Sequence, residues 1–66
     1  MSVMKVLEIM AESEKSWEAA TAKAITKASE TVKNIRSAYV QDQSVTVIDN
    51  KPHMYRVGLK ITFEVK

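Results

Sequence analysis

Residues 55–65 read YRVGLKITFEV, and this stretch decides the fold. Large apolar side chains stand at every second position, and polar or small residues stand between them. The apolar set is Tyr55, Val57, Leu59, Ile61, Phe63 and Val65. A period of two predicts a strand with one face against a core, and it defines the register strongly. We expect this last strand to span residues 53–65.

A second long strand is expected immediately before it, over residues 35–48. Its alternation is less regular, because Ala38 and Val40 share one parity whereas Val45 and Val47 share the other. This change of parity predicts a β-bulge or bend near residues 42–44. The connection, residues 49–52, reads DNKP and begins with residue types that tolerate left-handed backbone. The two strands are therefore predicted to form an antiparallel hairpin.

One helix and a short first strand precede this hairpin. Residues 3–10 (VMKVLEIM) are rich in branched apolar residues and predict the strand, which a polar segment, residues 11–15, ends. Ser13 is the candidate N-cap of the helix and Ser16 is the alternative. The helix is expected to end near Lys33. Its apolar stripe is dominated by alanine, which favours a close approach to a sheet; the stripe is Trp17, Ala20, Thr21, Ala24, Ile25, Ala28 and Val32.

The expected order is β-α-β-β, which defines an α+β fold in one domain, residues 1–66. A helical crossover makes the first two strands parallel, so the last strand is predicted to lie between them, antiparallel to both. The subunit is then a three-stranded antiparallel sheet wrapped around one helix.

The strands are longer than the helix can cover. A strand over residues 35–48 would run about 45 Å at ~3.3 Å per residue, whereas the helix would cover only about 27 Å at ~1.5 Å per residue. A chain of 66 residues without cysteine has a marginal core, and long unpaired edges promote association. We therefore expect self-assembly, with binding sites shared between copies.

Composition, charge and the lack of certain sequence patterns argue against several classes of protein. With 45% hydrophobic and 27% charged residues the chain is not expected to be disordered. A net charge of only +2 argues against nucleic-acid binding. No apolar run has the length of a membrane span, and no secretion signal is recognisable, so a cytoplasmic protein is expected. No nucleophile stands in a pattern with a base and an orienting group, so we expect no enzymatic activity.

In order, spacing and length the chain resembles the dodecin family. The similarity rests on residues 6–9 (VLEI), the helix start at residues 13–20, the helix end at 31–34, residues 40–43 (VQDQ) and the closing strand, residues 55–65. It implies a hollow homododecamer with tetrahedral symmetry, in which each helix lies on an inward-curved sheet. It also implies a non-catalytic role in binding or storing a small ligand.

The resemblance also implies a flavin pocket, which this chain lacks in its usual form. Flavin-storing dodecins have a stacking tryptophan early in the second strand and a glutamine in the third, and these positions fall on Ser37 and Arg56. Ser37 has no aromatic face, and Arg56 has donors but no acceptor. Tyr39, close to Ser37, is a candidate substitute surface. Ser37, Tyr39 and Arg56 are the residues predicted to line the equivalent pocket.

This pattern is more similar to the flavin-poor branch known as calcium dodecins. The branch implies calcium binding, although no set of calcium ligands can be assigned in this sequence. Three hypotheses remain: a different small ligand or calcium in place of flavin, flavin storage through other contacts, and a purely structural shell. Arg56 is predicted to make an ion pair between subunits or to bind an anion, and Trp17 is predicted to pack in the core or an interface.

Overall fold

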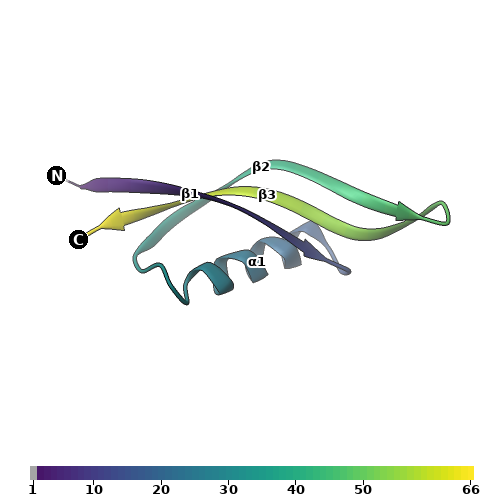
Figure 1. Cartoon of the computed structure of the whole chain (residues 1–66), viewed down its shortest axis with the longest axis horizontal. Helices are drawn as coiled ribbons and strands as arrows, with labels where there is room; N and C mark the ends of the chain where they lie inside the picture. The colour runs from purple at the N-terminus through teal and green to yellow at the C-terminus, as the bar shows by residue number, and fades with distance from the viewer. Residues whose placement is uncertain (1) are drawn as a thin grey trace.

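The computed structural model describes residues 2–66, which form a three-stranded antiparallel sheet with one helix against one face (Figure 1). The elements are β1 (Val3–Ser13), α1 (Trp17–Ala28), β2 (Ile35–Ile48) and β3 (Lys51–Val65). The strand order is β1-β3-β2, and β3 is antiparallel to both neighbours. The predicted α+β fold and the central position of the last strand are confirmed.

The central strand supplies the largest buried side chains of the core. Val57, Leu59 and Ile61 are almost fully buried, with exposed fractions of 0%, 1% and 0%. They alternate along β3 as the sequence predicted, and they face the helix. On α1 the small side chains Ala20, Ala24 and Ala28 are buried, which lets the helix lie close to the sheet.

Both ends of the helix differ from the first expectation. Ser16 is the N-cap, because its Oγ accepts a hydrogen bond from the backbone N–H of Ala19 at 2.9 Å. Ser13, the preferred candidate, accepts instead from the N–H of Lys15. The helix ends at Ala28 rather than near Lys33. After Ala28 the backbone forms turns, in which the N–H groups of Thr31 and Val32 both donate to the Ala28 carbonyl oxygen.

β1 is longer than predicted. It ends at Ser13 rather than Met10, because Glu12 and Ser13 still pair with Arg56 and Tyr55 of β3. The polarity of residues 11–15 suggested a loop, but cross-strand pairing holds the first three of them in the sheet. β3 also begins earlier than expected, at Lys51 rather than His53.

β2 and β3 form the antiparallel hairpin that the sequence predicted. The register shifts between Val40 and Asp42, next to the predicted bend, and two further shifts occur between Ile35 and Ser37 and near the hairpin end of β2. At the turn, Asp49 and Asn50 have positive φ values of 54° and 61°. Asn and Asp adopt this conformation at lower cost than other side-chain-bearing residues, which explains their place in the turn.

The sheet extends far beyond its helix. The chain measures 51 × 19 × 13 Å, whereas twelve helical residues cover only about 18 Å. The β2–β3 hairpin projects past α1 at one end, and the start of β1 and the end of β3 lie at the other (Figure 1). Among residues 2–66, ten large apolar side chains are exposed as a result, and they are Val3, Met4, Val6, Met10, Tyr39, Val40, Val45, Val47, Ile48 and Val65.

Candidate functional site

The face of the sheet turned away from the helix carries the predicted site residues. Because Leu59 and its alternate neighbours face α1, the residues between them on β3 face the opposite way. We call this surface the outer face. Residues paired directly across strands share a face, so Ser37 (opposite Thr62) and Tyr39 (opposite Lys60) belong to it.

The outer face brings two of the three predicted residues together. Ser37 and Tyr39 are alternate residues of β2, and Tyr39 is 65% exposed. Arg56 is on the same face but further along β3: the step from Lys60, the partner of Tyr39, to Arg56 spans about 13 Å at ~3.3 Å per residue. In a single chain, therefore, Arg56 lies apart from the other two.

A hollow of about 310 Å³ lies at Gly58 and Asp42, but none of the three predicted residues lines it. Arg56 instead lines a larger groove at β1 and α1. Gly58, which stands between Lys60 and Arg56 on β3, lies under the side chain of Asp42 from β2. A Cβ atom at position 58 would lie only 2.6 Å from Asp42 Oδ1, so glycine is what allows the carboxylate to rest on the strand. Glu8 and Met10 of β1 border the hollow on the other side. Sequence reasoning did not predict that Asp42 lies over Gly58, although an isolated glycine in an alternating strand was an available signal.

Charged side chains of the outer face pair across strands. Arg56 Nε donates to Glu12 Oε1, and Lys60 Nζ lies 3.8 Å from Glu8 Oε1. Within its own chain Arg56 pairs with Glu12, and the predicted ion pair with another subunit or contact with an anion stays a prediction. The sequence did not indicate this partner, because Glu12 was assigned to a loop.

A third pair lies near the chain ends. Glu64 Oε1 accepts from Arg36 Nη2 at 2.6 Å and from Arg36 Nε at 3.1 Å, and Ser2 Oγ donates to Glu64 Oε2 at 3.0 Å. These donors stabilise the carboxylate, so the Arg36 guanidinium, together with Ser2, holds the pKa of Glu64 below its ordinary value. The contact joins the start of β2 to the end of β3.

Trp17 has a structural role in this chain. Its Nε1 donates to the Ser44 carbonyl oxygen at 2.9 Å, and its ring meets the Tyr55 ring edge-on, with centroids 5.0 Å apart. The side chain also packs against the core cluster around Leu59. This supports the prediction that Trp17 packs rather than stacks on a ligand, and it ties the start of α1 to β2 and β3.

Metal-binding groups are sparse within one chain. Among residues 2–66, no three His, Cys, Asp or Glu side chains lie close enough together to hold a metal ion. Glu8 and Asp42 are two carboxylates at one hollow. Because calcium takes six to eight oxygen ligands, they could form only part of a calcium site.

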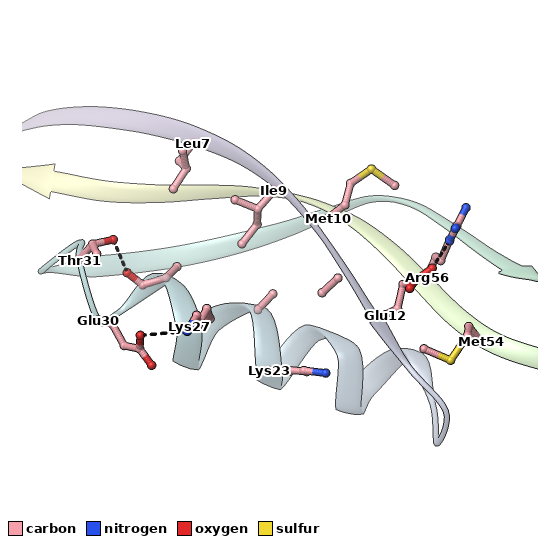
Figure 2. A pocket seen from close by; sticks show the side chains of 13 residues that line it. Leu7, Ile9, Met10, Glu12, Lys23, Lys27, Glu30, Thr31, Met54 and Arg56 are labelled. Carbon is pink, nitrogen blue, oxygen red and sulfur yellow. Dashed lines mark hydrogen bonds and ion pairs between the residues drawn. The ribbon is translucent and has the colours of Figure 1, made fainter.

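A larger groove lies on the other side of the sheet, between β1 and α1 (Figure 2). It has a volume of about 1010 Å³. Its apolar lining includes Leu7 and Ile9 of β1 and Ala24 of α1. Charged lining residues include Lys23 of α1 and Glu30, which follows the end of α1. We call it the α1–β1 groove. In the same part of the chain, residues 2–66, no helix is long and apolar enough to cross a membrane.

The architecture defines a class: a small α+β subunit in which one short helix lies on a much longer three-stranded sheet. The dodecin family model matches residues 3–66. A curated calcium dodecin from Mycobacterium tuberculosis is 38% identical over 66 residues, which cover 100% of this chain and 93% of that protein. The chain belongs to the dodecin family.

Solved structures agree with the fold. A single-substitution mutant of Thermus thermophilus dodecin matches with a TM-score of 0.94 at 26% identity, covering 100% of this chain and 98% of that one. A Streptomyces coelicolor dodecin matches with 0.94 at 25% identity, covering 98% and 93%. The calcium dodecin of M. tuberculosis, described as calcium-chelating with a novel calcium-binding site, matches with 0.85 at 37% identity, covering 98% and 93%. The predicted similarity to calcium dodecins is confirmed.

Proposed function

We propose that this chain forms a closed homododecamer that binds and stores a small molecule or ion without catalysis, in the cytoplasm. We place the ligand pocket on the outer face at Ser37, Tyr39 and Arg56. Because Arg56 lies apart from the other two within one chain, the pocket requires residues from more than one copy. Each chain acts as one domain. The observation that carries the proposal is the excess of sheet over helix, which leaves a single copy with uncovered borders.

The size of this excess supports assembly. The accessible surface is 5025 Å², whereas a compact chain of 7.4 kDa would expose about 4200 Å². The radius of gyration is 13.5 Å, against about 10.8 Å for a compact domain of this length. The surplus of about 800 Å² equals one partner's share of a standard protein interface.

The outer face favours a ligand other than flavin. Ser37 offers no ring for stacking, which is worth about 0.5–1.5 kcal/mol beyond burial for each aromatic pair. Arg56 can only donate hydrogen bonds, and its Nε is already engaged by Glu12. Both features weaken the two contacts that the family resemblance implies for flavin.

Calcium is the ion that the proposal favours. The similarity to calcium dodecins supports it, as do the carboxylates of Glu8 and Asp42 at the hollow. Since neither carboxylate has a third acidic neighbour in its own chain, we propose that oxygen ligands from more than one copy complete the site.

Flavin storage is the second candidate function, and Tyr39 is the observation that favours it. Its ring is 65% exposed and lies beside Ser37 on the outer face, where it could stack on a planar ligand. A purely structural shell is the third candidate, and it predicts neither bound flavin nor saturable calcium binding.

The pocket is tested by restoring the implied flavin contacts. The double variant Ser37→Trp/Arg56→Gln should bind riboflavin at least about tenfold more tightly than the parent, equivalent to about 1.4 kcal/mol, as measured by quenching of riboflavin fluorescence. The matched control, Ser29→Trp/Lys33→Gln, makes comparable changes at exposed positions just after α1, away from the outer face, and should leave affinity near that of the parent. If the first variant binds no better than the parent, the assignment of the pocket is wrong.

Calcium binding is tested by isothermal titration of the metal-free parent with calcium chloride. Saturable heat that is lost in Asp42→Asn is the expected result. Unsaturable heat, together with no retained flavin, would favour the structural shell.

A further inference from the structure

The α1–β1 groove is the largest hollow in the part of the chain that the structure describes. Ala24 and Ala28 let the helix lie close to the sheet, but their small side chains leave the space beside β1 unfilled. Leu7 and Ile9 of β1 are therefore only half-buried. The volume of about 1010 Å³ is at the upper end of the range for small-molecule sites, about 300–1,000 Å³.

Five charged side chains line the groove, and four of them already form ion pairs. Lys27 Nζ lies 3.4 Å from Glu30 Oε1, and Arg56 Nε donates to Glu12 Oε1. Lys23 is the fifth, and among residues 2–66 it forms no ion pair. In the view of Figure 2, the two pairs lie toward opposite ends of the groove, with Lys23 between them. The lining therefore carries one uncompensated positive charge.

The position of Lys23 on α1 favours an anion beside it. Lys23 stands four residues before Lys27, so the two ammonium groups lie on the same side of the helix. Like charges at this spacing destabilise a helix, and a bound anion relieves their repulsion. The Lys23 side chain is exposed, so its methylene stem can lie along the apolar lining while the ammonium group stays at the opening.

We propose that the α1–β1 groove binds a straight-chain alkyl carboxylate, with the carboxylate at Lys23 and the alkyl chain along Leu7 and Ile9. One negative charge matches the one unpaired lysine of the lining. The lining extends along β1 from Leu7 to Glu12, about 17 Å at ~3.3 Å per residue, and this elongated shape suits an unbranched chain. The site is formed within one chain and uses neither Ser37 nor Tyr39, so the inference goes beyond the proposed function.

A series of carboxylates of increasing length tests the apolar part of the site. The probes are sodium octanoate, decanoate and dodecanoate, each titrated into the protein as purified and below its micelle concentration, with isothermal titration calorimetry as the readout. Affinity should rise with length by up to about fourfold for each added methylene, because each methylene leaves water for the groove. Equal affinity for octanoate and dodecanoate would refute burial of the alkyl chain.

Substitutions of Lys23 test the charged part of the site. Lys23→Gln should weaken decanoate binding by about five- to tenfold, because it removes the unpaired ammonium group. Lys23→Arg keeps the charge and should retain most of the parent's affinity. The matched control, Lys15→Gln, removes the same charge at an exposed position before α1 and outside the lining, and it should bind as the parent does. Equal affinity of the parent and Lys23→Gln would refute the placement of the carboxylate.

Methyl NMR locates the bound chain. On addition of decanoate the methyl signals of Leu7 and Ile9 should shift, whereas those of Val47 and Ile48 at the hairpin end, which do not line the groove, should not. The opposite pattern would place the ligand elsewhere. The absence of saturable binding would show that the groove is covered, and it too would overturn the inference.

The native mass of the same sample separates these failures from failure of the proposed function. A dodecamer that binds no carboxylate refutes only the groove site. A folded single chain refutes the proposed shell, and the carboxylate titration of that chain still decides whether the groove site exists.

Discussion

Replacing Leu59 by alanine tests the packing on which the subunit depends. Leu59 is 1% exposed and lies on the central strand, opposite Ile9 and Val40, against Ala20 and Ala24 of the helix. Removing its three outer carbons forfeits about 2.4 kcal/mol of transfer free energy at ~0.8 kcal/mol per buried carbon. Leu→Ala substitutions in cores cost about 2–5 kcal/mol in total, depending on how far neighbours fill the space.

The alanine stripe places the expected cost in the upper half of that range. Because the facing helical side chains are already alanines, they have no atoms that can move into the void. We expect Leu59→Ala to lower the free energy of unfolding by about 3.5–5 kcal/mol, against a total of about 3–10 kcal/mol for a chain of this length.

Urea denaturation followed by the fluorescence of Trp17 measures this effect, because the only tryptophan packs against the same cluster. All variants are compared at one subunit concentration, since assembly contributes to apparent stability. The control is Val40→Ala on β2, whose side chain is 37% exposed, and it should cost less than half as much. A loss below about 1.5 kcal/mol for Leu59→Ala, or equal losses for the two variants, would refute close packing of helix on sheet.

Two further predictions concern local contacts. Because Arg36 lowers the pKa of Glu64, this carboxylate stabilises the fold above the ordinary glutamate pKa of about 4.3 and loses that contribution as the pH falls through its lower folded value. Glu64→Gln should therefore flatten the acid side of a stability–pH profile measured by urea denaturation, and an unchanged slope would count against the ion pair. Ser16→Ala should cost about 0.5–2 kcal/mol, because it removes the N-cap, whereas Ser13→Ala should cost less. Thermal melts of both variants measure these stability losses. A larger loss for Ser13→Ala than for Ser16→Ala would indicate that Ser13 is the N-cap.

Strong periodicity is what made the fold predictable. The alternation along β3 predicted its buried face, and the crossover rule predicted that it lies between β1 and β2. Element ends were less predictable, because tertiary contacts set them. Pairing of Glu12 with Arg56 extends β1 into residues whose polarity suggested a loop, and turns after Ala28 end the helix although Val32 continues its apolar spacing.

The site was less predictable than the fold. The family resemblance predicted that Ser37, Tyr39 and Arg56 line one pocket, but sequence alone did not show how far Arg56 lies from the other two. The Gly58–Asp42 hollow was missed because it depends on the register shift between Val40 and Asp42, which sets which β2 residue lies over the glycine. Periodicity indicated a bend near this point without specifying that partner.

The central claim is that copies of this chain must cover each other's exposed sheet borders. Native mass spectrometry of freshly purified protein at micromolar subunit concentration tests it most directly. The account predicts a particle of about 89 kDa, twelve times the chain mass of 7.4 kDa, with any retained ligand visible as added mass. A folded species of one chain mass at that concentration would contradict it.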